Sequence, residues 1–170
     1  IFMNNYHILD QIGEGSFGRV YKARRKFTGR IVAIKMINKL GQSKEDISSF
    51  RSEIDILKKV DHPNIMRHIE IFETNTDICL VSELARGDLF QIIDDNQTLP
   101  KEILKSVAAQ LVSALTDLHK CRIIHRDMKP QNVLICANGA LKVCDFGFAR
   151  ALSNTLVFKS IKGTPLYMAP

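Results

Sequence analysis

The part of the sequence that decides the fold is the stretch His125-Arg126-Asp127-Met128-Lys129-Pro130-Gln131-Asn132, followed further along by Asp145-Phe146-Gly147. Five of its positions (His, Arg, Asp, Lys and Asn) would recur together in roughly one window in three million if all residues were equally frequent. Asp127 can accept the proton of a hydroxyl, and Lys129 can neutralise a transferring phosphate. Asn132 and Asp145 offer the hard oxygen ligands that Mg²⁺ prefers. The stretch therefore predicts a site for phosphoryl transfer.

The composition is that of an ordinary globular protein. The 170 residues are 45% hydrophobic and 25% charged, which is enough for at least one core. No apolar run approaches the ~20 residues that span a bilayer, and the start lacks a basic segment followed by an apolar stretch, so secretion is not expected. Cys79, Cys121, Cys136 and Cys144 form no Cys-x-x-Cys pair, which favours reduced thiols in a cytoplasmic setting over a disulfide frame or a metal site.

The net charge is +6, and part of the excess lies in Lys22-Ala23-Arg24-Arg25-Lys26. Such a run can attract nucleic acid or acidic lipid. We expect an ordinary solvated surface instead, because the run has no interleaved aromatic residue and no nucleic-acid-binding motif accompanies it.

The order of local patterns predicts an α+β fold in two lobes. Short β-rich runs at 6–12, 19–23, 31–37, 65–72 and 78–82 predict a five-stranded antiparallel sheet. One amphipathic helix is expected against it, with Ser43-x-x-Asp46 as a capping-box-like start and apolar positions at Ile47, Phe50, Ile54 and Leu57. We place the first lobe at 1–82, a hinge at 83–87 and a mostly helical, truncated second lobe at 88–170.

A second helix is predicted after Pro100, a good first-turn residue. Its apolar stripe is wide, which indicates a buried helix, and it comprises Leu104, Val107, Ala108, Leu111, Val112, Leu115 and Leu118.

The segment Gly13-Glu14-Gly15-Ser16-Phe17-Gly18 lies between two predicted strands. Its glycines let a hairpin backbone close over phosphates without side-chain clashes. The same spacing in a Rossmann loop opens a helix, whereas here Val20 continues a strand. Taken alone, the segment favours phosphate binding, and a glycine hairpin that binds nothing is the alternative.

Lys35 ends the apolar run Val32-Ala33-Ile34-Lys35, in which alternation puts Ala33 and Lys35 on one face. Two anions are available to this lysine, the phosphates of a nucleotide and the carboxylate of Glu53 on the first helix. A lysine that reaches solvent from a strand edge is the alternative. His125 and Phe146 are expected to pack ring against ring and to hold the two loops of the opening stretch in register.

These motifs resemble the eukaryotic protein kinase family over essentially the whole chain, and within it the Fused-type serine/threonine kinases. The sequence segments that are similar are GEGSFGRVY at 13–21, GDLF at 87–90, AQLVSAL at 109–115, DMKPQN at 127–132, CDFGFARA at 144–151 and SIKGTPLYM at 160–168. The resemblance implies a kinase that uses ATP and Mg²⁺ and phosphorylates serine, less often threonine, in a protein substrate. It also implies a cytoplasmic location, with microtubule or ciliary association in some relatives.

The resemblance also implies roles for individual residues. Asp127, Lys129, Lys35 and Glu53 would be catalytic, and Asn132 and Asp145 would bind the metal. The backbone of Glu83 and Ala85 would contact adenine, whose faces would pack against Ile12, Val20, Ala33 and Leu134. Ser82 would be a small gatekeeper that leaves a back pocket open, and the segment 13–18 would cover the phosphates.

Regulation is expected from Arg126, because a phosphate added by an upstream kinase to Ser153, Thr155 or Ser160 would pair with it and order the loop. The alternative is that these three hydroxyl residues are ordinary solvated loop residues without a regulatory role. Thr164 is expected to brace the catalytic loop.

Two features depart from the family pattern. His68 stands where an aliphatic residue usually completes a stack with Leu57, Phe146 and His125, which puts the stability of the active state in question. The chain stops at Pro170, inside the Ala-Pro-Glu motif, so the long helix is expected to lack its packing partner and the fragment to be inactive or poorly folded alone. A noncatalytic kinase-like scaffold is therefore the alternative function.

Overall fold

The computed structural model describes residues 5–15, 18–43, 47–48, 50–51, 54–55, 58, 60–96, 98–146, 150–151 and 163–168. The chain divides into two compact units. The N-terminal unit comprises Ile1–Arg51 and Arg67–Leu84, and the C-terminal unit comprises Ser52–Met66 and Ala85–Pro170. The lobe and hinge boundaries expected from the sequence stay a prediction.

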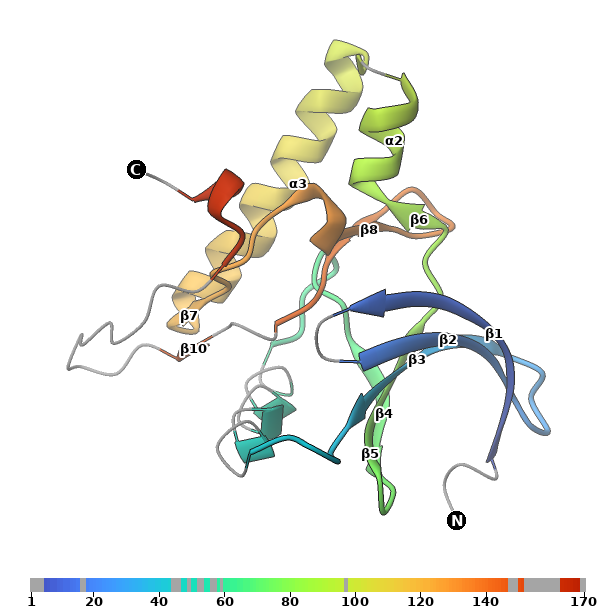
Figure 1. Cartoon of the computed structure of the whole chain (residues 1–170). Coiled ribbons are helices and arrows are strands. Elements are labelled where there is room, and N and C mark those ends of the chain that lie inside the picture. The colour runs from blue at the N-terminus through green and yellow to red at the C-terminus, as the bar shows by residue number, and fades with distance from the viewer. Residues whose placement is uncertain are drawn as a thin grey trace. The chain divides into compact units, whose positions relative to one another are not determined.

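The N-terminal unit is built on five antiparallel strands (Figure 1). They are β1 (Tyr6–Gly15), β2 (Gly18–Arg25), β3 (Ile31–Asn38), β4 (His68–Glu73) and β5 (Asp77–Glu83), in the order β1-β2-β3-β5-β4. The predicted five-stranded antiparallel sheet is confirmed.

Alternation along the strands separates the two faces of this sheet. Val32 and Ile34 of β3 are fully buried on one face. They pack there with an apolar cluster that includes Tyr6, Ala23, Phe72, Cys79 and Val81. Ala33 and Lys35 alternate with these residues, so they lie on the other face, as the sequence predicts.

The predicted strand at 65–72 begins too early, because β4 starts only at His68. Ile65 instead forms an isolated parallel bridge with Val143, and the Met66 amide donates to the Val143 carbonyl at 2.9 Å. The pairing partner lies far along the sequence, and local composition does not reveal it.

The first predicted helix is described only in part. Residues 47–48, 50–51 and 54–55 are helical, and Phe50 and Ile54 are buried, in agreement with the apolar pattern. Arg51 donates from Nε and Nη2 to the two carboxylate oxygens of Glu73, each at 3.1 Å. Asp46 and Leu57 lie outside the described residues.

The C-terminal unit contains two longer helices and several short elements. The helices are α2 (Leu89–Asn96) and α3 (Lys101–Lys120), and the 3₁₀ turns are η2 (Pro130–Asn132) and η3 (Pro165–Tyr167). The strands form a sheet β6-β8-β9 and a pair β10-β7, with bounds Gly87–Asp88, Ile123–Ile124, Val133–Ile135, Leu141–Val143 and Arg150–Ala151 for β6 to β10. No helix among the described residues is long and apolar enough to cross a membrane.

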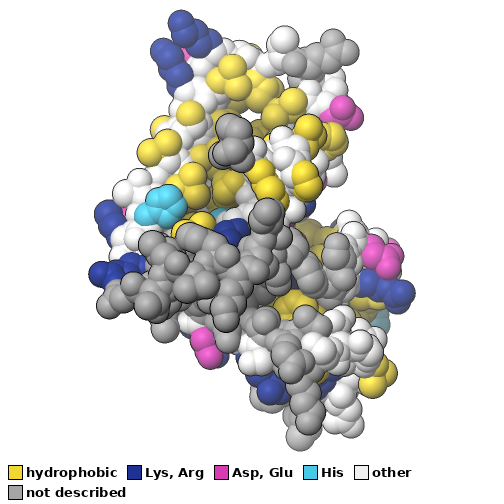
Figure 2. Space-filling model, turned by 60° about the vertical axis from the view of Figure 1, so that its left-hand side comes forward, with side chains coloured by type: hydrophobic (Ala, Val, Ile, Leu, Met, Phe, Trp, Pro, Cys, Tyr) yellow, Lys and Arg dark blue, Asp and Glu magenta, His cyan; other side chains and the backbone are white. Residues whose placement is uncertain are grey.

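Helix α3 is only partly buried, which differs from the burial predicted from its stripe and agrees with the expectation that the helix lacks a packing partner. Ala114 and Leu118 are fully buried against Ile65, Ile123 and Val143. Leu104 is 50% exposed and Val112 is 63% exposed, because no described element covers that side. Figure 2 shows hydrophobic side chains gathered on the upper part of one face, at the height of α2 and α3.

Candidate active site

Asp127 is the centre of a hydrogen-bonded cluster in the C-terminal unit. It follows β7 on the loop that leads into η2, and it is only 6% exposed. The Asn132 amide donates to the Asp127 carboxylate at 2.9 Å and to its backbone carbonyl at 2.8 Å. The Thr164 hydroxyl donates to the other carboxylate oxygen at 2.7 Å, and the Lys129 ammonium lies 3.0 Å from the carboxylate.

These donors keep Asp127 ionised. Burial on its own raises the pKa of a carboxyl group, but the hydrogen bonds from Thr164 and Lys129 outweigh it and lower the pKa of Asp127 below its usual value. A buried carboxylate with three donors is therefore held negative and fixed in orientation.

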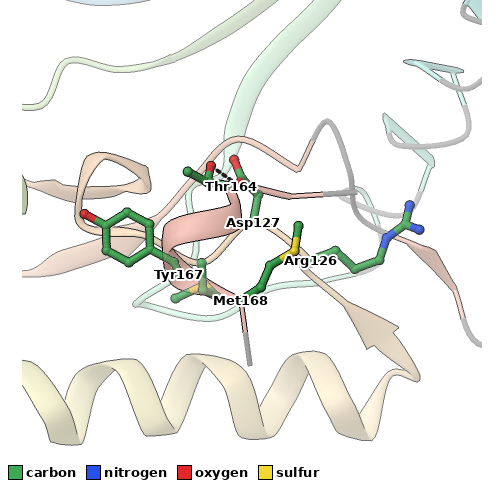
Figure 3. Close-up of a pocket in the computed structure, with 6 residues that line it drawn as sticks. Arg126, Asp127, Thr164, Tyr167 and Met168 are labelled. Atoms are coloured by element: carbon green, nitrogen blue, oxygen red, sulfur yellow. Dashed lines mark hydrogen bonds between the residues drawn. The ribbon is translucent and has the colours of Figure 1, made fainter. Parts of the chain in front are cut away.

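Thr164 connects this cluster to a segment that is distant in the sequence. Lys129 donates to its hydroxyl at 2.9 Å, and the same hydroxyl donates to Asp127. Thr164 thus braces the loop that contains Asp127 and Lys129, as expected. Figure 3 shows the Thr164 and Asp127 side chains pointing toward one another.

A cavity of about 240 Å³ opens beside Asp127. Its lining is Arg126, Asp127, Met128, Thr164, Tyr167 and Met168. In Figure 3 the Arg126 side chain extends away from Thr164. The presence of Tyr167 and Met168 beside Asp127 was not predicted, although both belong to the segment 160–168 that resembles the family.

Gly163 permits the segment 163–168 to lie close to the loop that contains Arg126 and Asp127. Its φ is +133°, a conformation that side-chain-bearing residues rarely adopt, and a Cβ at this position would lie 2.5 Å from the Arg126 carbonyl oxygen. A larger residue would push Thr164 away from Asp127.

His125 and Phe146 pack against each other with ring centroids 4.8 Å apart, which confirms the predicted contact. The His125 Nε2 donates to the Cys144 carbonyl at 2.9 Å, and its Nδ1 accepts from the Asp127 amide at 3.2 Å. The second bond requires the neutral ring, because an Nδ1 that accepts a hydrogen bond carries no proton. Burial favours that state, because it lowers the pKa of His125 despite the hydrogen bond to Cys144.

The two residues expected to bind a metal are linked through the backbone. The Cys144 amide, next to Asp145, donates to the Asn132 carbonyl at 2.9 Å. The Asn132 side chain turns its nitrogen toward Asp127, so its carbonyl oxygen is left for another partner. Asp145 has φ of +57°, an uncommon value for aspartate.

The glycine-rich segment lies at the end of the β1–β2 hairpin, where Gly15 pairs with Gly18. A Cβ at Gly18 would lie 2.0 Å from the Met36 carbonyl oxygen, so the fold itself requires glycine there. A Cβ at Gly15 would meet nothing within 4 Å, and one at Gly13 would make only an ordinary contact with Val20. No contact among the described residues explains these two glycines.

Lys35 and the expected adenine-binding residues occupy defined positions in the N-terminal unit. Lys35 lies opposite Val20 on one side and Leu80 on the other, and Ala33 lies opposite Ser82. Ile12 is 48% exposed, and Glu83 ends β5. In the C-terminal unit, Ala85 precedes β6 and Leu134 lies in β8.

His68 faces Ser82 across the β4–β5 pair, and its Nδ1 is the buried side-chain nitrogen or oxygen without a hydrogen-bond partner among the described residues. His68 departs from the family pattern in sequence, but the sequence does not indicate that its Nδ1 lacks a partner.

Several expected site residues lie outside the described residues. They are Glu53, Ser16, Phe17 and the three hydroxyl residues Ser153, Thr155 and Ser160.

Comparison with known proteins finds relatives that are all protein kinases. A sequence model described as "Protein kinase domain" matches residues 6–170. The chain is 56% identical over 169 residues to serine/threonine-protein kinase TIO of Arabidopsis thaliana, 53% to serine/threonine-protein kinase 36 of Mus musculus, and 47% to serine/threonine-protein kinase fused of Drosophila melanogaster. Each match covers 99% of this chain but only 13%, 13% and 21% of the respective relative.

Proposed function

The chain belongs to the protein kinase family, and on this premise we propose that it is a serine/threonine kinase that transfers the γ-phosphate of ATP to a protein hydroxyl. The names of its relatives support serine/threonine specificity. Serine is proposed as the preferred acceptor, with threonine second. The chain spans only a small share of those relatives, so the substrates and partners of a longer protein are part of the proposal as well.

The observation that carries the proposal is the buried, ionised Asp127 with its three donors. A carboxylate with a low pKa orients the substrate hydroxyl and accepts its proton as the bond to phosphorus forms. Lys129, which lies 3.0 Å from Asp127, would offset the negative charge on the transferring phosphate. Both side chains are held in place by Thr164 before any substrate arrives.

We assign Asn132 and Asp145 to Mg²⁺. Their side-chain oxygens suit a hard cation. The side-chain oxygen of Asn132 fits this role, because the side-chain nitrogen is the atom that faces Asp127. When bound, Mg²⁺ would neutralise phosphate oxygens. Gly13 and Gly15 are assigned to phosphate binding because their lack of side chains has no internal explanation.

We also propose how the nucleotide is bound, how the protein is regulated and where it works. Lys35 and Glu53 would position the phosphates. Ile12, Val20, Ala33, Ser82, Glu83, Ala85 and Leu134 would contact adenine. An upstream kinase would act on Ser153, Thr155 or Ser160, and the protein would work in the cytoplasm.

The test is transfer of labelled phosphate from ATP to a serine peptide and to its threonine counterpart. Asp127→Asn keeps the shape of the side chain but removes the base, so the rate should fall about 10²- to 10⁴-fold. Asp95→Asn, at an exposed position of α2, is the matched control and should retain the wild-type rate.

Nucleotide binding is measured separately as a shift in melting temperature. Asp127→Asn should keep the shift caused by ATP with Mg²⁺, whereas Asp145→Asn should lose the part that depends on Mg²⁺. A full transfer rate in Asp127→Asn would refute the role of this carboxylate, and an unchanged Mg²⁺ response in Asp145→Asn would refute the metal assignment.

A further inference from the structure

The turn that joins β2 to β3, residues 25–30, presents an aromatic side chain entirely to solvent. Phe27 is 102% exposed, so its ring is not buried by any described residue. It is the largest exposure among the big hydrophobic residues described. The turn projects beyond the end of the five-stranded sheet (Figure 1).

The backbone holds Phe27 in an unfavourable conformation. The Thr28 amide donates to the Lys26 carbonyl at 2.8 Å, and Phe27 between them has φ of +66°. This is a γ-turn whose central residue has positive φ, a rare and strained form. The Gly29 amide donates to the Arg25 carbonyl at 3.0 Å, and the Lys26 amide to the Asn5 carbonyl at 2.8 Å, so the turn is tied down on both sides.

The chain around Phe27 is strongly basic. Between Glu14 and Glu45 the sequence has nine lysines and arginines and no acidic residue. Arg24, Lys26 and Arg30 are exposed and form no ion pair with any described residue. Arg25 is the exception, because it lies 3.9 Å from Glu70.

An ordinary solvated surface was expected at 22–26 because this run contains no aromatic residue, but Phe27 directly follows it and is exposed among these cations. Neither Phe27 nor these cations take part in the proposed phosphoryl transfer. We propose that this turn is a docking site for an anionic membrane surface, with Phe27 entering the interface and Arg24, Lys26 and Arg30 contacting lipid headgroups. Binding would be peripheral and would not depend on the kinase activity.

The surroundings of Phe27 favour a membrane over a peptide that docks through apolar side chains. Such peptides bind in a groove or add to a free sheet edge. Phe27 is fully exposed in a turn, and both strands beside it are already paired on each side, β2 with β1 and β3, and β3 with β2 and β5. A lipid interface needs no groove and takes up single aromatic rings together with basic side chains.

Vesicle binding tests the proposal. The probes are vesicles of phosphatidylcholine alone and vesicles with about 30% phosphatidylserine, compared by co-sedimentation with the whole chain. The wild type should bind only the second kind. Phe27→Ala should weaken binding about tenfold or more. The double variant Arg24→Glu/Lys26→Glu should weaken it about 25-fold or more, since each cation contributes about fivefold.

Matched controls separate the turn from general charge and general hydrophobicity. Lys101→Glu/Lys105→Glu makes the same change in net charge at exposed positions of α3 and should bind as the wild type does. Phe90→Ala removes a partly exposed ring from α2 and should also leave binding unchanged.

The absence of tryptophan from the sequence provides a direct reporter of insertion. Phe27→Trp carries a single tryptophan at the tip, and its emission should shift to the blue on addition of phosphatidylserine vesicles. Phe90→Trp should show no shift under the same conditions.

Three results would overturn the proposal. The first is failure of the wild type to bind phosphatidylserine vesicles. The second is binding that is unaffected by Phe27→Ala and gives no blue shift in Phe27→Trp, which would leave a merely basic surface. The third is a blue shift of Phe27→Trp with soluble polyglutamate or duplex DNA equal to that with vesicles, which would indicate a polyanionic macromolecule as the partner.

Discussion

His68 is a residue whose surroundings do not match its chemistry. Its Nδ1 is buried without a hydrogen-bond partner among the described residues, which costs about 1–3 kcal/mol for a polar group. Burial, together with the positive charge of Lys35, lowers the pKa of His68 from 6.5 to about 4. The ring is therefore neutral at pH 7, and the cost of protonating it in the folded state is high.

The resulting pH dependence can be predicted with its sign. Between pH 6.5 and about 4 the unfolded chain binds a proton at His68 and the folded chain does not, so the free energy of unfolding falls as the pH falls. The loss from this residue is at most about 3 kcal/mol. His68→Leu should remove it, as measured by urea unfolding across this range. The exposed His7→Leu should follow the wild type, and equal slopes in all three proteins would contradict the assignment.

At the same scale, the local part of the site was predictable and the long-range part was not. Asp127, Lys129 and Asn132 lie within six positions, so their proximity follows from the sequence itself, and the structure joins them by hydrogen bonds. Tyr167 reaches the cavity only because the chain folds back, and the orphan nitrogen of His68 depends on what surrounds it in three dimensions.

Helix α3 shows what periodicity reports at the scale of an element. The apolar stripe correctly predicted a helix, and its inner part, Ala114 and Leu118, is buried. The pattern gives the width of an apolar face but not what covers it, so periodicity alone does not predict which residues, such as Leu104 and Val112, are exposed. The late start of β4 has a similar cause, since the partner of Ile65 is the distant Val143.

The same substitution at two positions of α3 should therefore have unequal effects. Leu118→Ala removes a side chain that is fully buried and should lower the free energy of unfolding by about 2–5 kcal/mol. Leu104→Ala, at a position 50% exposed, should cost less than about 1 kcal/mol. Chemical denaturation of both variants measures the difference, and equal losses would show that α3 is covered evenly.

On the scale of the whole molecule, each of the two compact units contains a buried cysteine. Cys79 is fully buried in the N-terminal unit, and Cys136 is 5% exposed in the C-terminal unit, whereas Cys121 is exposed. Burial also raises the pKa of Cys79 to about 11, which lowers its thiolate fraction at neutral pH.

Thiol labelling under native conditions should therefore modify Cys121 first, with Cys79 at least about a hundredfold slower. In rising urea, Cys79 and Cys136 should become reactive as their own units unfold, and Leu118→Ala should move the Cys136 midpoint to lower urea. Mass spectrometry of the labelled peptides gives each midpoint. Native-state labelling of Cys136 as fast as Cys121 would contradict the described core.

The single hydroxyl of Thr164 makes the Asp127 carboxylate, the proposed base, depend on a segment that is distant in the sequence. Because that hydroxyl donates to Asp127 and also accepts from Lys129, withdrawal of residues 163–168 would remove one donor from Asp127 and one acceptor from Lys129, leaving the ammonium with the Asp127 carboxylate. The pKa of Asp127 therefore depends on whether residues 163–168 lie in place. Placement of that segment and preparation of the proposed base occur together.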